Sequence, residues 1–288
     1  MKSAIHFQSL CMFVLKGIFA ALLLVVPLTG LAAEQTPRRI VSLAPSLTRE
    51  IYDLNAQDQL VGVTSYCGTM AASKELIGSP ARINIEKTLS LKPHLVLAST
   101  DCNSKSDVEM LERLGCTVKV FTACESFSCM CSTFQELGRV LGRSRQAEEV
   151  LQNIRRELDS IRNSLRGKKP LRVFWQTGAD PLITASDATF SGEFIRRSGC
   201  TNIFADAPMR YPRVNVEEVI RLDPDVILVV TQMGSHASPA MWDRYPTMSA
   251  VRNNRVKSLP ADLVCQPTPV MFLKGCRALA AALYPGVP

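Results

Sequence analysis

Hydrophobic and polar positions follow two different periods along the chain after residue 38. Short apolar runs rich in β-branched residues predict buried strands, and apolar residues at three- and four-residue steps predict helices. The predicted strands are Arg39–Ala44, Leu60–Ser65, Leu95–Ser99, Val118–Phe121, Leu171–Thr177, Val226–Val230 and Val256–Leu259. The predicted helices are Leu47–Leu54, Asp107–Leu114, Ser132–Leu141, Thr189–Ser198 and Met271–Leu283. Strands that alternate with helices indicate parallel βα units, whereas residues 67–83 lack periodicity and are expected to form a loop.

The longest helical pattern lies in the middle of the chain, at residues 144–167. Ala147 and further apolar residues down to Leu165 recur at three- and four-residue steps and form one stripe. Ser144 is a suitable N-cap, and Gly167 is a suitable stop. A helix of about 22 residues is roughly 33 Å long. We expect this helix to join two α/β halves as a stiff link, although an ordinary surface helix of one half would show the same pattern.

One motif occurs twice, once in each predicted half. Residues 84–100 read NIEKTLSLKPHLVLAST and residues 215–231 read NVEEVIRLDPDVILVVT. Each copy predicts a short helix that is capped by an asparagine, stopped by a proline and followed by a buried strand. Glu86 and Glu217 take the same position in the two copies. A carboxylate there suits the helix dipole, but the shared register of the whole motif suggests matching charges offered to a partner.

The first 33 residues are typical of a secretory signal peptide. Lys2 and Lys16 precede an apolar stretch that runs into small residues near Ala32 and Ala33. The stretch is short for a membrane span, and Cys11 lies before it, unlike the cysteine of a lipoprotein signal. We therefore expect a soluble mature chain of about 255 residues in the periplasm, with an uncleaved anchor as the alternative.

Charge and cysteine content narrow the function classes. The formal net charge is +7, but the basic residues are scattered and show no aromatic-and-basic pattern, so nucleic acid is not an expected partner. Of the 10 cysteines, Cys11 leaves with the signal peptide, so an odd number remains in an oxidising compartment. At least one thiol is then free, bound to something, or shared between chains.

Several linked segments resemble the periplasmic binding proteins that feed cobalamin, haem and iron–siderophore ABC importers. In family order they read RIVSLAPSLTREIYDLNAQDQLVGVTSY, INIEKTLSLKPHLVLAS, SGCTNIFAD and VNVEEVIRLDPDVILV. The segments RVFWQTGADPLIT and MRYPRVNVEEV are most similar to the members that bind cobalamin. The resemblance covers essentially all of residues 38–285. It implies an α/β fold with two lobes of mostly parallel sheets, 38–143 and 168–288, joined by the rigid helix 144–167 around a ligand cleft.

The resemblance also implies the function. Such a chain captures a corrinoid ligand without catalysis and delivers it to the permease dimer of an ABC importer, with an iron–siderophore or haem as the alternative ligand. By their place in the motif, Glu86 and Glu217 would dock on arginines of the permease. The protein would act as a monomer with no resident cofactor or metal.

The ligand cleft is expected at the carboxyl ends of the strands, where open α/β sheets bind ligands. The residues at these ends are Pro45, Ser46, Tyr66, Asp101 and Cys102 in the first lobe, and Gln176, Gly178, Tyr211 and the loop around Cys265 in the second. Aromatic walls suit a flat corrin or porphyrin ring, and the two tyrosines stand where the family carries aromatic contacts. Ser99 stands where cobalamin-binding members carry an aromatic residue, so one side of the cleft is less aromatic.

The cysteines allow further hypotheses. The resemblance implies a disulfide between Cys200 and Cys276. The residues themselves leave two interpretations open for the others, namely extra disulfides such as Cys124–Cys129, or soft-metal ligation by thiolates including Cys129 and Cys131. An exported thiol redox protein is a further alternative. The chain has no Cys-x-x-Cys pair to support it, and a hydrolase is disfavoured because no Gly-x-Ser-x-Gly elbow is present.

Overall fold

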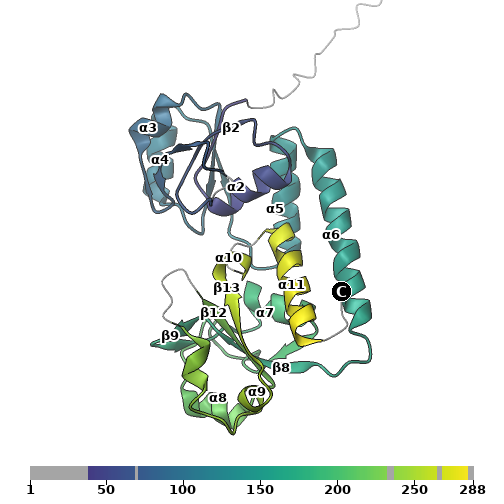
Figure 1. Cartoon of the computed structure of the whole chain (residues 1–288). Helices are drawn as coiled ribbons and strands as arrows, with labels where there is room; N and C mark the ends of the chain where they lie inside the picture. The colour runs from purple at the N-terminus through teal and green to yellow at the C-terminus, as the bar shows by residue number, and fades with distance from the viewer. Residues whose placement is uncertain (1–37, 69–70, 232–236, 265–267, 285–288) are drawn as a thin grey trace, which may run out of the picture. The chain divides into compact units, whose positions relative to one another are not determined.

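Two parallel β-sheets, one in each lobe, organise the chain (Figure 1). The computed structural model describes residues 38–68, 71–231, 237–264 and 268–284. The first sheet has the strand order β3(Glu75–Leu76), β2(Leu60–Val63), β1(Ile40–Ser42), β6(Leu95–Ser99) and β7(Val118–Phe121). The second has the order β11(Cys200–Asn202), β8(Leu171–Gln176), β12(Val226–Thr231) and β13(Val256–Pro260). Every pairing within these two sheets is parallel, as the alternation of strands and helices predicts.

The two sheets share one plan. The row β2-β1-β6-β7 of the first lobe corresponds to β11-β8-β12-β13 of the second. The central strands β1, β6 and β12 are buried almost throughout, which is why their sequences read as continuous apolar runs instead of alternating ones. The described residues therefore confirm the α/β class with two lobes of parallel strands.

Helices cover the sheets and connect the lobes. In chain order they are α2(Pro45–Asp53), α3(Ile85–Ser90), α4(Lys105–Arg113), α5(Phe127–Val140), α6(Ser144–Ser164), α7(Phe190–Arg197), α8(Val216–Leu222), the 3-10 turn η2(Pro239–Trp242), α9(Ser249–Arg252), α10(Ala261–Val264) and α11(Pro269–Leu283). Two antiparallel hairpins complete the fold, β4(Gly78–Ser79) with β5(Arg82–Ile83) and β9(Gly178–Ala179) with β10(Leu182–Ile183). No helix in these described ranges is long and apolar enough to cross a membrane.

The predicted central helix is α6, and its apolar stripe is buried. Ala147, Leu151, Ile154, Leu158 and Ile161 pack into the main core, while the rest of the helix surface is largely polar. Helix α6 contacts both α5 and α11, and the three lie alongside one another (Figure 1). An ion pair between Glu157 and Arg277 adds a polar contact between α6 and α11. The last helix of the second lobe thus packs against the connecting helix.

The local boundaries differ from the sequence-based ones in a few places. The segment 67–83 carries the short strands β3, β4 and β5, which are too short to give a periodic signal. Strand β11 has only three residues and escaped prediction for the same reason. Ser144 is the first residue of α6 instead of its N-cap, which is Arg143, and no side chain caps this end. The bounds of these elements are set by tight turns and not by apolar periodicity.

Candidate functional site

The repeated motif forms the same local structure in both lobes. Asn84 caps α3 by accepting a hydrogen bond from the backbone N–H of Lys87 at 2.8 Å, and Asn215 caps α8 by accepting from that of Glu218 at 2.7 Å. Glu86 and Glu217 each occupy the second helical position and are exposed. A carboxylate in this turn is favoured by the helix dipole and remains open to a partner.

The likeness extends to the far ends of these two helices. Lys92 and Asp223 both adopt positive φ, 46° and 40°, immediately before a proline. Arg39 at the start of β1 donates to the Leu91 carbonyl, and Arg172 in β8 donates to the Asp223 carbonyl at 3.0 Å. Each arginine satisfies a carbonyl that the helix end leaves free and holds the helix against the first residues of the central strand.

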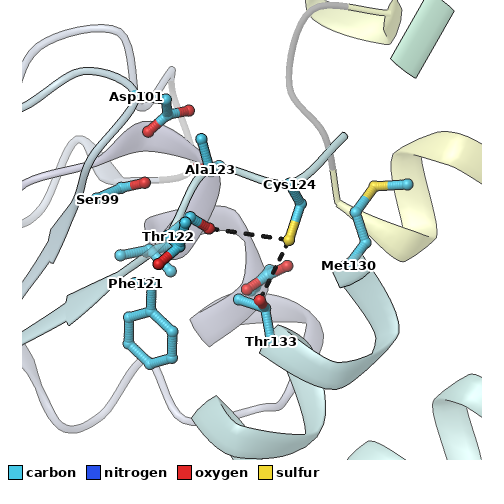
Figure 2. A pocket seen from close by; sticks show the side chains of 11 residues that line it. Ser99, Asp101, Phe121, Thr122, Ala123, Cys124, Met130 and Thr133 are labelled. Atoms are coloured by element: carbon cyan, nitrogen blue, oxygen red, sulfur yellow. Dashed lines mark hydrogen bonds between the residues drawn. The ribbon is translucent and has the colours of Figure 1, made fainter. Parts of the chain in front are cut away.

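A small cavity lies at the carboxyl edge of the first sheet (Figure 2). Its volume is about 20 Å³, and it is bounded by the ends of β6 and β7 and by α2 and α5. Two of the predicted ligand residues, Ser46 and Asp101, line it together with Ser99, Thr122 and Thr133. Part of the predicted first-lobe site therefore lies together at the carboxyl ends of the strands, where open α/β sheets bind ligands.

Glu50 also lines this cavity, although its side chain is only 2% exposed. Burial raises the pKa of the Glu50 carboxyl well above its ordinary value, and the neighbouring Asp53 raises it further. Sequence reasoning missed this residue. A signal was present, because Glu50 falls three residues after Leu47 and one before Ile51, on the apolar face of the predicted helix.

The other first-lobe candidates surround the same edge. Pro45 opens α2, where its missing N–H costs nothing. Tyr66 is 74% exposed and adopts a positive φ of 71°, so its ring is free to meet a ligand. Cys102 is half-buried, and burial raises the pKa of its thiol to about 12, with a further contribution from Asp101. Burial also raises the pKa of the Cys67 thiol, which donates to Thr48 Oγ1 at 3.3 Å.

Among the second-lobe candidates, Gln176 is fully buried at the end of β8, where its Oε1 accepts a hydrogen bond from Trp242 Nε1 at 2.8 Å. Its amide nitrogen donates to the Gly178 carbonyl at 3.2 Å. Both ends of the amide thus serve internal bonds and no surface is exposed, and the contact of Gln176 with a ligand stays a prediction.

The remaining second-lobe candidates differ in exposure. Gly178 is half-buried in β9, where an added Cβ would come within 2.9 Å of the Pro181 carbonyl oxygen, so the position favours glycine. Tyr211 is 49% exposed at the surface. Cys265 lies outside the described residues.

Sequence reasoning also missed an ion pair between Glu125 of the first lobe and Arg210 of the second, because nothing in either segment signals its partner.

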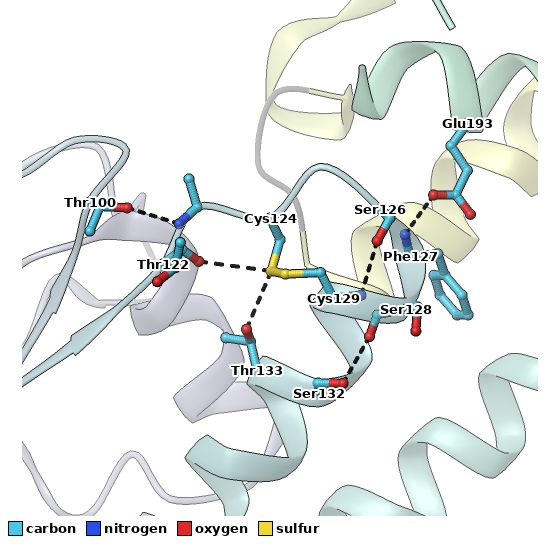
Figure 3. Close-up of a disulfide and its surroundings, with 11 residues drawn as sticks. Thr100, Thr122, Cys124, Ser126, Phe127, Ser128, Cys129, Ser132, Thr133 and Glu193 are labelled. Atoms are coloured by element: carbon cyan, nitrogen blue, oxygen red, sulfur yellow. Dashed lines mark hydrogen bonds between the residues drawn. A yellow bond between two sulfur atoms is a disulfide. The ribbon is translucent and has the colours of Figure 1, made fainter. Parts of the chain in front are cut away.

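Two of the sequence hypotheses concern disulfides, and Figure 3 shows the Cys124–Cys129 pair. Cys124 and Cys129 are joined in a disulfide, which confirms that pairing and leaves Cys129 without a thiolate for metal ligation. The Cys200–Cys276 disulfide implied by the family resemblance is absent, since both are free buried thiols. Cys200 Sγ lies 3.7 Å from the Ser198 carbonyl and 3.9 Å from Tyr284 Oη, while Ser198 also bonds the Cys276 side chain. Each thiol is thus satisfied by oxygen partners instead of by the other sulfur.

No metal centre is evident within the described ranges, where no three His, Cys, Asp or Glu side chains gather into a group able to hold a metal ion. The free thiols Cys67, Cys102 and Cys200 all have raised pKa values because they are buried. A raised pKa disfavours the thiolate that would act as a nucleophile or a ligand.

Two α/β lobes with parallel sheets, a connecting helix and a polar carboxyl edge define a substrate-binding protein of the periplasmic class. Residues 40–263 match the family described as periplasmic binding protein, and the chain belongs to this family. The vitamin B12-binding protein of Vibrio cholerae is 30% identical over 262 residues, which cover 90% of this chain and 93% of that protein. The family and this relative are substrate-binding proteins, not enzymes.

Solved structures show the same likeness. The crystal structure of the periplasmic vitamin B12-binding protein of Vibrio cholerae is 29% identical with a TM-score of 0.71, covering 86% of this chain and 97% of that one. A periplasmic haem-binding protein from Pseudomonas aeruginosa is 23% identical with a TM-score of 0.74, covering 88% of this chain and 94% of that one. The second likeness shows a common fold.

Proposed function

We propose that this chain is the substrate-binding component of an ABC importer, which captures a corrinoid of the cobalamin class and delivers it to a membrane permease. The observation that carries this proposal is the similarity to a vitamin B12-binding protein, which is 30% identical and covers 90% of this chain. The first 33 residues act as a cleavable signal, and the mature protein works in the periplasm as a monomer.

The ligand binds at the carboxyl edges of the two sheets. Tyr66 and Tyr211 support this assignment, since exposed aromatic rings suit the flat, largely apolar face of a corrin. Ser46 and Asp101, with the half-buried Cys102 next to Asp101, provide a polar margin in the first lobe, and Gly178 is the backbone position of the second lobe assigned to the ligand. The protein needs no cofactor of its own, because the metal chelate is its cargo.

The permease is contacted through the two copies of the repeated motif. Glu86 and Glu217 stand exposed at equivalent positions on the two lobes, which suits docking on two matching basic sites of a permease dimer. Charged groups at such a contact set orientation and association rate more than affinity.

Haem or an iron–siderophore is the second candidate ligand. Such anionic chelates favour basic residues, and Arg210 is the arginine beside the predicted ligand residue Tyr211. Arg210, however, is already paired with Glu125, which reduces its availability to an anion. Arg82 and Arg213, which are exposed, are the other arginines that would suit an anionic ligand, so the similarity to the vitamin B12-binding protein ranks the two candidates. An exported thiol redox protein has less support, because burial raises the pKa of the Cys67 and Cys102 thiols.

Direct competition between ligand classes tests the proposal. The mature chain is titrated by calorimetry with cyanocobalamin, with hemin and with a ferric siderophore. We expect saturable one-to-one binding of cyanocobalamin with a Kd in the micromolar range or below, and much weaker binding of the other two. Tight binding of hemin or the ferric siderophore without cyanocobalamin binding would reject the corrinoid assignment and retain the family.

A further inference from the structure

The carboxyl group of Glu50 lies in the first-lobe cavity without a full set of partners. Glu50 Oε2 is buried, and no described residue forms a hydrogen bond with it. Buried polar groups are nearly always hydrogen-bonded, because an unmet bond is costly. A buried acid that faces a cavity and lacks a protein partner indicates that the partner arrives with a ligand.

Burial raises the pKa of the Glu50 carboxyl and so favours its neutral form. Asp53, one turn later on α2, raises the pKa of Glu50, while the nearby cations Arg49 and Lys274 act on Asp53. Asp101 contributes a further negative charge across the cavity, whereas the α5 residues that line it, Met130 and Thr133, are uncharged. A neutral carboxylic acid presents one O–H donor and one carbonyl acceptor side by side.

The rest of the cavity suits a small group that both donates and accepts. Its volume of about 20 Å³ is enough for one or two groups the size of water, but not for a ring. The N-cap of α2 is Ala44, which offers no side chain to the first N–H groups of this helix. Hydroxyls of Ser46 and Ser99 line the opening, and Leu47 and Phe121 form apolar walls.

A primary carboxamide matches this arrangement. It carries two N–H donors and a carbonyl acceptor, and can pair with a neutral carboxylic acid through two hydrogen bonds. A carboxylate could accept one bond from Glu50, but it would bury a charge near Asp101 and leave the Glu50 carbonyl oxygen without a donor. Corrinoids carry primary carboxamides around the ring, whereas haem carries carboxylates.

We propose that Glu50 is a specificity-determining residue that receives a peripheral carboxamide of the ligand in this cavity and selects against carboxylate-bearing chelates. This inference rests on the corrinoid function proposed above and adds to it the residue and the chemical group that set the choice. The contact lies at the carboxyl edge of the first sheet, between α2 and the ends of β6 and β7.

The protein side of the test compares three variants with cyanocobalamin as the probe. Glu50→Gln keeps a donor and an acceptor and should bind within about threefold of the wild type. Glu50→Met removes both and should bind at least about tenfold more weakly, because the carboxamide is left unpaired. Tyr52→Phe is the control on the same helix; Tyr52 does not line the cavity, and the variant should leave the Kd unchanged.

Two further measurements keep the result interpretable. The ligand-free Glu50→Met protein should melt no lower than the wild type, since it loses a buried polar atom that has no partner. For the wild type, cyanocobalamin derivatives with one carboxamide hydrolysed to an acid are titrated in turn. At least one should bind about tenfold more weakly than cyanocobalamin, and this arm needs no folded variant.

The possible outcomes separate the two proposals. If wild-type protein binds cyanocobalamin but Glu50→Met binds it equally well, the role of Glu50 is rejected and the corrinoid function stands. Equal binding of all the monocarboxylic acids has the same meaning. If the wild type does not bind cyanocobalamin, the corrinoid function and this inference fall together.

Discussion

The two lobes are alike on one side and different on the other. Both have the same parallel strand order, the same asparagine-capped helix and the same exposed glutamate. At the carboxyl edge the likeness ends. The first lobe has a polar cavity with the buried acid Glu50, whereas the second fills the end of β8 with Trp242. The repeated features suit a symmetric partner, and the unequal ones suit an asymmetric ligand.

Replacing Trp242 with alanine should have the largest effect on stability. Its side chain is fully buried, contacts Phe174 at 5.6 Å between ring centroids, and donates to Gln176. Loss of a buried tryptophan typically costs about 3–5 kcal/mol, and here the Gln176 oxygen also loses its donor. Urea unfolding measures the change. A cost below about 1 kcal/mol would show that Trp242 does not close this lobe as we describe.

Asp53→Asn should remove a pH dependence that belongs to the first lobe. Burial raises the pKa of Asp53 to about 6, despite opposing charges on Lys274 and Arg49. Because the folded-state value is above the ordinary one near 3.8, the native state is favoured at low pH and loses stability as pH rises towards 6. The loss corresponds to roughly 3 kcal/mol at most.

Unfolding measured at pH 4 and pH 7.5 tests this expectation. The variant should gain stability relative to the wild type at pH 7.5 and gain little at pH 4. A difference that is the same at both pH values would contradict the assignment to Asp53.

Removing the two helix caps should have equal, moderate effects. Asn84→Ala and Asn215→Ala each delete a side-chain bond to a backbone N–H in the first helical turn. Each should cost about 1 kcal/mol. Chemical unfolding of the two single variants makes the comparison. Costs that differ by more than about 1 kcal/mol would show that the motif does not have the same structural role in both lobes.

Removing the repeated glutamates should have the smallest effect on stability and a specific effect on docking. Glu86→Ala and Glu217→Ala should each change unfolding by no more than about 0.5 kcal/mol, because both side chains are exposed. Both should slow association with the permease in a salt-dependent way. Glu218→Ala, at the next position in the same turn of α8, is the matched control and should associate normally. Normal association of both variants would reject the docking role.

Most helices and strands could be predicted from the sequence, because their apolar residues recur with a clear local period. Apolar runs such as Val118–Phe121 and the stripe of α6 have clear periods, and the structure has elements at those places. Two-residue strands such as β4 carry no period and depend on partners that are distant in the chain. They could not be predicted from local pattern alone.

The candidate site was predicted only in part, for a physical reason. The preference of ligands for the carboxyl ends of parallel strands indicates a region of the molecule, and Ser46 and Asp101 line the cavity found there. It does not tell which side chains turn inward, as the side chain of Gln176 does where it accepts a hydrogen bond from Trp242. It also passed over Glu50, which enters the cavity from the second turn of α2 instead of from a loop.

Hydrogen exchange with and without cyanocobalamin tests the central comparison most directly. We expect slower exchange on ligand binding at the carboxyl edges, in peptides covering 44–50 and 99–103 of the first lobe and 177–179 of the second. Peptides covering 85–90 and 216–222, which hold the repeated glutamates, should exchange at unchanged rates. Protection of those two helices without protection of the carboxyl edges would contradict the division of the molecule into an unequal ligand side and a repeated docking side.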